Sequence, residues 1–356
     1  MILMLNILSM TGSIHNWLQE VLPAGWTEPV EWVLIAVAYL TFFAVAGLLL
    51  VWMERRIAAF FQLRLGPNRV GPSGLFQTIA DALKLLTKEL TGTEKADKFL
   101  YNLAPYFVIV AALVSLSVLP FSAELQAFDI NIGVFFIMGV SSIGVIGILL
   151  GGWASNNKYS LIGAMRSGLQ TVSYELSVGL SILTIVLLSG SLRISEIVEV
   201  QRAGGWFILQ GHIPAIIAFM IFMIAGTAET NRAPFDMVEA ESELGAGFHT
   251  EYSGMKFAYF FLAEFINMFI IAAIAVTMFF GAYLSPFGIT ESLPWLGVFW
   301  FMLKVLIIIF LMMWFRWTFP RLRVDQLLTL EWKYLLPLNL MNIVLMAIII
   351  WLNWTF

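Results

Sequence analysis

The chain has 356 residues, of which 60% are hydrophobic and only 12% are charged, and its formal net charge is −4. Soluble domains carry about 25% charged residues and about half apolar residues, so this composition excludes both a soluble domain and a disordered chain. The negative net charge also argues against nucleic acid as a partner. The composition therefore predicts a polytopic membrane protein.

The sequence contains no cysteine and only three histidines, His15, His212 and His249. Cysteine thiolates hold iron–sulfur clusters, and histidines are common haem ligands. All three histidines lie outside the apolar runs, and the chain has no glycine-rich nucleotide motif. We therefore expect no redox centre and no metal site here, so that other proteins must carry any electrons.

Eight windows are long and apolar enough to cross a membrane, because a spanning helix needs about 20 mainly apolar residues. We detect no internal repeat and no low-complexity linker between them. The sequence thus predicts an all-α fold with eight transmembrane helices in one integral membrane domain, residues 1–356. The predicted spans are 32–53, 101–120, 133–154, 170–189, 214–228, 257–284, 295–315 and 335–355.

The distribution of basic residues predicts the orientation, since Lys and Arg accumulate on the inner side of a membrane. Sixteen of the nineteen Lys and Arg residues lie on one side, in segments 54–100, 155–169, 229–256 and 316–334. Arg193 and Arg202 lie on the opposite side, and Lys304 lies within the seventh span. We expect the large loops 54–100, 229–256 and 316–334 to face the cytoplasm or a mitochondrial matrix, and both termini to face outward.

The first inner loop predicts an amphipathic helix. The turn residues Gly66-Pro67-Asn68 and Gly71-Pro72 interrupt the chain after the first span. Beyond them an apolar face is flanked by polar residues, a pattern that suits a helix lying in the membrane interface or one packed on a partner subunit. The apolar face comprises Leu75, Ile79, Leu83, Leu86 and Leu90.

Ionisable residues inside the spans are unusual, because each costs about 2.5–3.5 kcal/mol at mid-bilayer. Glu175, Glu264 and Lys304 lie within spans, and Glu54 and Glu229 lie at the inner ends of two others. Each can be a hydrogen-bonded or ion-paired group that fixes helix register. Two carboxyls against one lysine leave an excess of acid, however, which favours a proton-exchanging role for Glu175 and Glu264.

The loop after the fifth span is dense in carboxylates. Pro234 is expected to open a short helix, since the first helical position needs no backbone donor. Such a helix would place Asp236, Glu239 and Glu243 on one face, with Glu241 between them. A charge run is ordinarily a solvated surface, but the apolar flanks here favour a coupled, proton-exchanging cluster that also includes Glu229.

Two long motifs carry a resemblance to a known family. The first runs from Glu54-Arg55-Arg56 to the segment Gln62-Leu63-Arg64-Leu65-Gly66-Pro67-Asn68-Arg69-Val70-Gly71-Pro72, and the second runs from Ala228 through Asp236 to Leu244. Both resemble the H subunit of NADH–quinone oxidoreductase, which is NADH dehydrogenase subunit 1 in mitochondria and a membrane component of respiratory complex I. The chain departs from the family pattern at Leu322 and Val324, where aromatic residues are common.

The resemblance implies that the chain forms the membrane part of a quinone tunnel and couples quinone reduction to proton translocation. It implies that Glu54, Arg55, Arg64 and Arg232 line or support the quinone path. It also implies a proton-coupling role for a set of carboxyl groups. These are Glu175, Glu264, Glu229, Asp236, Glu239, Glu241 and Glu243.

The same resemblance implies the surroundings of the chain. Quinone is the substrate, and FMN and iron–sulfur clusters reside only in partner subunits. The partners are hydrogenase-like subunits at the quinone site, one of which bears the terminal iron–sulfur cluster, together with small membrane subunits, antiporter-like subunits and the lipid bilayer. The location is the inner membrane of a bacterium in preference to that of a mitochondrion.

Three alternatives compete with this interpretation. A homologous membrane subunit of an energy-converting hydrogenase, or of a related reductase, would have the same fold without NADH. A secondary transporter would also bury acids in its spans, but transporters commonly show inverted repeats and broken helices, which we do not detect. A purely structural anchor would tolerate replacement of Glu175 or Glu264 by glutamine.

Overall fold

The computed structural model describes residues 26–123, 125–237, 245–286, 294–352 and 354, and this part of the chain is helical without β-strands. Eight helical segments are long and apolar enough to cross a membrane. The predicted all-α, multi-pass fold is therefore confirmed. The segments are α2 (Thr27–Phe61), α4 (Lys98–Ser117), α5 (Gly133–Ala154), α6 (Lys158–Ser189), α9 (His212–Glu229), α11 (Gly254–Phe279), α12 (Pro294–Thr318) and the continuous unit α13–η4–α14 (Val324–Trp351).

Several helices extend beyond their apolar windows. Helix α2 continues to Phe61, so Glu54 and Arg55 belong to a helix and not to a loop. Helix α6 begins at Lys158, whereas 155–169 was expected to be a connection. Hydropathy marks the part of a helix that is apolar, but backbone hydrogen bonding continues into the polar zone, where long charged side chains reach water.

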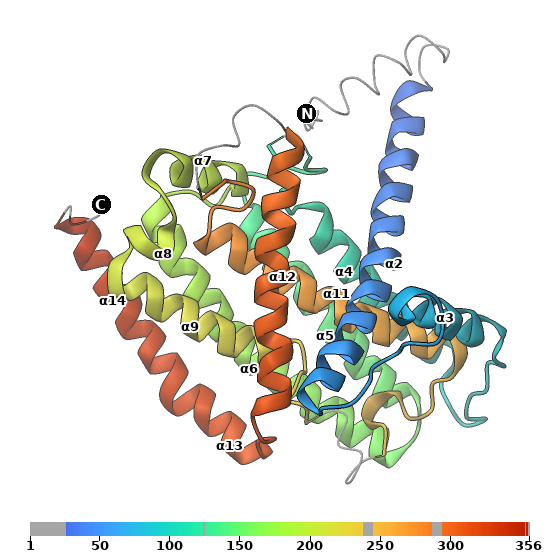
Figure 1. Cartoon of the computed structure of the whole chain (residues 1–356). Helices are drawn as coiled ribbons and strands as arrows, with labels where there is room; N and C mark the ends of the chain where they lie inside the picture. The colour runs from blue at the N-terminus through green and yellow to red at the C-terminus, as the bar shows by residue number, and fades with distance from the viewer. Residues whose placement is uncertain (1–25, 124, 238–244, 287–293, 353, 355–356) are drawn as a thin grey trace.

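Short helices cover both ends of the bundle. On the side of the basic loops lie η1, α3 and η2, and on the opposite side lie α7 and α8, which the sequence did not predict (Figure 1). The eight crossings place the start of α2 and the end of α14 on this second side (Figure 1). The bounds are η1 Pro72–Gly74, α3 Gln77–Thr87, α7 Ile194–Gly204, α8 Phe207–Gln210 and η2 Gly247–His249.

Helix α11 forms the centre of the bundle, between α2 and α12 on one side and α4, α6 and α9 on the other (Figure 1). Every residue from Met268 to Phe279 is buried, as expected for a helix that is apolar on all its faces. Lys304 of α12 completes the end of this helix. Its Nζ donates to the carbonyl oxygens of Phe280, Ala282 and Leu284 at 2.6–2.9 Å, so in this structure it stabilises a helix end.

Helices α4, α5 and α6 approach one another closely at glycines. A Cβ atom on Gly147 would lie 2.6 Å from Val108 Cγ2 in α4, and one on Gly152 would lie 2.3 Å from Ala164 Cβ in α6. Small residues at such positions let backbones meet, which is the usual basis of association in lipid. These three packed helices form one wall of the site described below.

The predicted amphipathic helix corresponds to α3, which ends at Thr87, before Leu90. Ile79, Leu83 and Leu86 are exposed on its apolar side. Its polar side is held against α2, where Arg55 and Asp81 form an ion pair at 2.5 Å. The exposed apolar side is compatible with a membrane interface and with a partner subunit, as the sequence also left open.

The helix that was expected to begin at Pro234 does not form over residues 234–237, which adopt a turn instead. Its backbone polar groups have partners outside the loop. The carbonyl of Pro234 accepts from the Leu322 N–H, and the carbonyl of Phe235 accepts from the Gln170 side chain. These long-range hydrogen bonds replace those of a helix, and sequence-local rules cannot anticipate them. Residues 238–244 lie outside the described part of the chain.

Candidate functional site

Two cavities meet at the inner half of α11. The first, which we call the arginine groove, has a volume of about 490 Å³ and lies between α2, α11, α12 and the loops that follow α2 and α9. The four residues that the sequence assigns to a quinone path, Glu54, Arg55, Arg64 and Arg232, all line it. The remaining lining residues are Val51, Ala58, Leu65, Gly66, Pro67, Phe261, Glu264, Phe265, Arg316 and Trp317.

A network of ion pairs forms the floor of the arginine groove. Arg232 Nη1 donates to Glu54 Oε2 at 2.9 Å, and Arg232 Nε lies 3.2 Å from Glu264 Oε1. Arg316 Nη1 also donates to Glu54 Oε1. The guanidinium of Arg232 lies 4.1 Å from the ring centroid of Phe265, a cation–π contact. A single buried guanidinium therefore joins two carboxylates from different helices, and a planar fork of donors is suited to this task.

The rim of the arginine groove is more open. Arg55 pairs with Asp81 of α3, and both side chains are substantially exposed. Arg64 Nε donates to the side chain of Gln62 at 2.6 Å. With Arg232 and Arg316 the groove carries four arginines against two glutamates, so its electrostatic character is positive.

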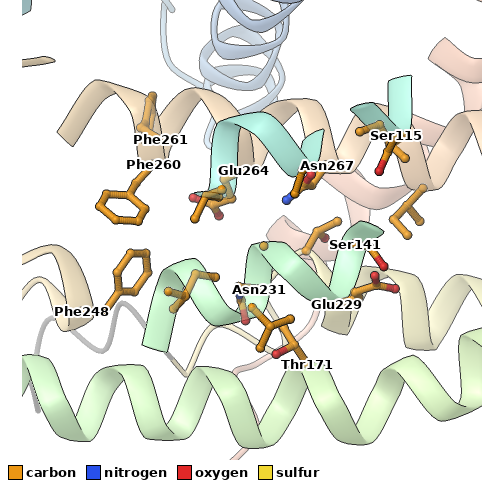
Figure 2. Close-up of a pocket in the computed structure, with 18 of the residues that line it drawn as sticks. Ser115, Ser141, Thr171, Glu229, Asn231, Phe248, Phe260, Phe261, Glu264 and Asn267 are labelled. Atoms are coloured by element: carbon orange, nitrogen blue, oxygen red, sulfur yellow. The ribbon is translucent and has the colours of Figure 1, made fainter. Parts of the chain in front are cut away.

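The second cavity, which we call the acid pocket, has a volume of about 80 Å³ and lies between α4, α5, α6 and α11. In Figure 2, Glu264 and Asn267 project into it from one side, and Asn231 and Thr171 project from the other. Ser115, Ser141 and Glu229 gather at one end, and Phe248, Phe260 and Phe261 form the other end. Among the described residues that line the acid pocket there is no Lys or Arg.

Glu264 is common to the two cavities. It lines the arginine groove, where it meets Arg232, and it lines the acid pocket together with Phe261. The sequence predicted a buried carboxyl at this position, but it did not predict that the carboxyl would connect two chambers. A group in this place can respond to charge in one cavity and exchange a proton with the other.

Glu229 lies at the far end of the acid pocket, and Glu175 lies near Glu229 without lining the pocket. Glu229 lines the pocket, and its Oε2 is buried without a hydrogen-bond partner among the described residues. Glu175 lies close enough to Glu229 for the two carboxyls to interact electrostatically, and its Oε1 accepts a hydrogen bond from Ser142 of α5. Two carboxyls from different spanning helices therefore lie close together at this end of the pocket.

His249 at the aromatic end of the acid pocket is an uncharged group at neutral pH. Burial lowers the pKa of its imidazole from 6.5 to about 4, because the charged form loses its hydration. Its ring makes edge contacts with Phe248 and Phe257, at centroid distances of 4.9 and 5.2 Å. The pocket therefore combines carboxyl groups with a neutral imidazole.

The loop after α9 is held in place by one side chain that sequence reasoning missed. Gln170 Nε2 of α6 donates to the carbonyls of Ala228 and Phe235, at 2.7 and 2.8 Å. Phe235 is buried against Tyr174, with ring centroids 5.5 Å apart. Asp236 follows Phe235 and lines neither cavity. Glu239, Glu241 and Glu243 lie outside the described residues.

Sequence reasoning also left the partners of Arg316 open and gave no role to Asn267. Arg316 directly follows the apolar run of the seventh span, which suggests an orienting charge, but its partner Glu54 is 262 positions away. Asn267 stands three residues after Glu264, so a helical repeat places both on the same face of α11. The three-residue spacing of Glu264 and Asn267 could therefore have predicted from the sequence that the two side chains share one face.

Comparisons with known proteins agree with these motifs. The family model described as NADH dehydrogenase matches residues 34–347. The chain is 55% identical over 348 residues, 96% of both proteins, to the H subunit of NADH-quinone oxidoreductase from Bacteroides fragilis. It is 45% identical to NADH-quinone oxidoreductase subunit 8 of Rhodothermus marinus, covering 92% of this chain and 98% of that protein. The chain therefore belongs to the NADH dehydrogenase family, as an H-type membrane subunit of NADH–quinone oxidoreductase.

Proposed function

We propose that this subunit forms the membrane-embedded part of the quinone-binding tunnel and couples quinone reduction to proton translocation. The observation that carries the proposal is the position of Glu264, which lines both cavities and meets Arg232 in the arginine groove. A carboxyl in this position can convert a change of charge in the groove into a change of protonation in the acid pocket.

The arginine groove has the chemistry that a quinone headgroup requires. Quinone carbonyl oxygens accept hydrogen bonds, and Arg55, Arg64 and Arg232 supply N–H donors around the groove. Phe265 and Trp317 supply apolar surface for the ring and its tail. Ligand sites typically combine apolar walls with a few placed polar groups. Glu54 supports the site indirectly, because it holds both Arg232 and Arg316.

Coupling follows from the shared guanidinium. Reduction of a quinone to a quinol consumes two electrons and two protons, and the electrons come from partner subunits. Negative charge that develops in the groove attracts Arg232 and weakens its contact with Glu264. Glu264 then takes up a proton and relays the change to Glu229 and Glu175 through the acid pocket. Moving one charge across 100 mV requires about 2.3 kcal/mol, which a change of about two in a carboxyl pKa can match.

The acidic loop is proposed to supply protons near the reduced headgroup. Asp236 follows a segment anchored by Gln170 and Phe235, which supports a loop held at the inner end of α9. Glu239, Glu241 and Glu243 are assigned the same role from the resemblance alone. The loop and the acid pocket together would form a chain of carboxyl groups from the inner side to Glu175.

The remaining proposals concern the surroundings. The family membership supports other subunits of NADH–quinone oxidoreductase as partners, and we propose that these include the hydrogenase-like, small membrane and antiporter-like subunits, with FMN and iron–sulfur clusters confined to partners. We propose a bacterial inner membrane as the location and one integral membrane domain. The exposed apolar side of α3 supports contact with acyl chains there.

Replacement of the acid-pocket carboxyls tests the proposal. Glu264→Gln and Glu229→Gln keep side-chain volume and remove the titrating group, so we expect proton pumping in membrane vesicles to be lost or strongly reduced. Oxidation of NADH by an artificial acceptor should continue, because the variants leave the partner subunits intact. Glu199→Gln is the matched control, since Glu199 is an exposed carboxyl on the opposite side. Normal pumping in both pocket variants would show that these carboxyls only fix the helices.

A further inference from the structure

The buried carboxyl of Glu331 lies away from both cavities. Glu331 is 0% exposed, in the six-residue π-helix η4 (Leu330–Leu335) that joins α13 (Val324–Thr329) to α14 (Leu336–Trp351). It forms no ion pair with any Lys or Arg of the described residues. The sequence places position 331 in a predicted inner loop, where a carboxyl needs no explanation. A buried carboxyl without a cation does need one.

The π-helical turn directs Glu331 toward the core. Eight residues separate Glu331 from Asn339, so an uninterrupted α-helix would place their side chains about 80° apart. The wider turn of η4 absorbs one residue, and both side chains then face α6. Single π-helical turns inside α-helices occur frequently at functional sites. Here the turn brings the Glu331 side chain against a polar stripe of α6, which includes Ser177 and Ser181.

That polar stripe lies where η4 and α14 pack on α6, and a further polar contact joins α14 to α9. Ser177 Oγ donates to Glu331 Oε1 at 2.5 Å, and Asn339 Nδ2 donates to the Ser177 carbonyl at 3.1 Å. Ser181 Oγ donates to Asn339 Oδ1 at 3.2 Å. One turn further on, Asn342 Nδ2 donates to the Pro214 carbonyl of α9 at 2.9 Å. Polar side chains thus follow one another along η4 and α14, from Glu331 to Asn342.

Two atoms of this stripe lack partners. Glu331 Oε2 and Asn342 Oδ1 are both buried and make no hydrogen bond with the described residues. More than nine-tenths of buried polar atoms in proteins are hydrogen-bonded, and ordered water commonly satisfies those that protein groups do not reach. The two unsatisfied atoms therefore point to bound water between α6 and α14. The carboxyl itself is favoured in its neutral acid form, because burying an unpaired charge is costly.

Glu331 and the acid pocket lie on different sides of α6. Glu175 and Ser177 stand two residues apart on α6, and they face α5 and α14 respectively. Glu331 therefore lies across α6 from the acid pocket. Tyr174 connects this region to the loop after α9, because its hydroxyl donates to the Leu327 carbonyl at 3.0 Å and its ring packs on Phe235. Movement of that loop would reach the helix that carries Glu331.

We propose that Glu331 is a second proton-loading carboxyl of this subunit, served by bound water in the α6–α14 interface. The acid gives its proton to a bound water and the resulting carboxylate takes one back, so that one proton moves in each direction and no redox chemistry is involved. The proposal rests on the proton-translocating function proposed above, but it concerns a route separate from Glu264, Glu229 and Glu175.

Infrared difference spectroscopy of the purified whole complex, transferred from H₂O to D₂O, tests the proposal. A protonated carboxyl gives a carbonyl band that shifts when its proton exchanges. We expect Glu331→Gln to lose one such band and to lower the number of protons pumped per NADH oxidised. Glutamine keeps an acceptor for Ser177 and offers an amide donor, so the helix contact is retained. Glu199→Gln, an exposed carboxyl, should change neither quantity.

Ser177→Ala keeps the carboxyl and removes its hydrogen bond, so it should shift the same band if the glutamine variant fails to assemble. An unchanged set of exchangeable bands in both variants would overturn the proposal, and so would normal pumping in an assembled Glu331→Gln complex. Normal pumping in Glu331→Gln with lost pumping in Glu229→Gln would reject only this inference. Normal pumping in both Glu229→Gln and Glu264→Gln would reject the proposed function.

Discussion

The arginine groove and the acid pocket share Glu264, but they treat buried charge in opposite ways. In the groove every described carboxylate meets an arginine, and Arg232 alone contacts Glu54 and Glu264. In the pocket Glu229 lies with Glu175 nearby, and the described lining contains no Lys or Arg. The groove therefore holds its carboxylates in ion pairs, whereas the described pocket lining provides no cation for Glu229.

The difference supports the proposal that one subunit combines a ligand-binding groove with a proton-transferring pocket. Paired charges give a fixed geometry, which a ligand headgroup needs, whereas unpaired carboxyls give sites whose protonation responds to a nearby field. Glu264 belongs to both arrangements at once. The comparison predicts that stability is most sensitive in the groove interior, less so in the pocket and least at the groove rim.

The largest effect is expected from Arg232→Ala. Removing one partner of a buried pair leaves uncompensated charge and destabilises a protein by about 3–5 kcal/mol. Arg232 and Glu54 are both buried, and the variant also loses the contact with Phe265. We expect a lower denaturation midpoint of the purified complex and weaker quinone reduction. Arg232→Lys keeps the charge but not the planar fork, so it should fall between wild type and alanine.

An unchanged midpoint and unchanged apparent quinone affinity in Arg232→Ala would break the comparison, because the groove would then not depend on its shared guanidinium. A loss of quinone affinity with an unchanged midpoint would separate binding from stability in the groove. Arg316 would then be enough to hold Glu54 when Arg232 is absent.

The groove also shows what the sequence could and could not predict. Hydropathy located all eight spans because each contains a long apolar stretch, and the motifs identified Glu54 and Arg232 as members of one site. The sequence could not predict their direct contact, because 178 positions separate them and pairing depends on how helices pack. The same limit applies to Gln170, which organises the loop after α9 by hydrogen bonds across 58 to 65 positions.

Local rules failed where tertiary contacts compete with them. Pro234 was expected to open a helix, but its carbonyl accepts from Leu322 and the segment forms a turn. Glu331 was not predicted as a site residue, because the surrounding segment was predicted to be an inner loop. In the structure it lies in the π-helical turn η4 and is buried. Lys304 was expected to be ion-paired or hydrogen-bonded, and the structure shows three backbone carbonyls around its Nζ.

An intermediate effect is expected from His249 in the acid pocket. Its pKa is lowered from 6.5 to about 4 in the folded protein, so between these values the unfolded chain binds a proton that the folded chain does not. The free energy of unfolding therefore rises with pH across this window. The contribution of the neutral His249 is fully present above pH 6.5 and is lost progressively as the pH falls to 4. The loss reaches about 3 kcal/mol.

Replacing the ring tests this dependence. The denaturation midpoint should fall less steeply between neutral pH and about pH 5 in His249→Gln than in the wild type. Above neutral pH the midpoints of the two proteins should differ by a constant amount. Equal acid sensitivity in wild type and variant would mean that other groups control it, and the pocket would lose its neutral imidazole as a distinguishing feature.

The smallest effect is expected at the groove rim. Arg55 and Asp81 have side-chain exposures of 42% and 30%, so solvent screens their attraction even though their atoms are 2.5 Å apart. Exposed pairs of this kind contribute about 0–1 kcal/mol, and we expect Asp81→Asn to leave the denaturation midpoint nearly unchanged. Arg55→Ala should instead raise the apparent KM for quinone, because Arg55 lines the groove. A double-mutant cycle at two salt concentrations measures the pair directly. A coupling as large as the effect of Arg232→Ala would mean that rim and interior are not distinct, and that α3 is locked to α2 by charge.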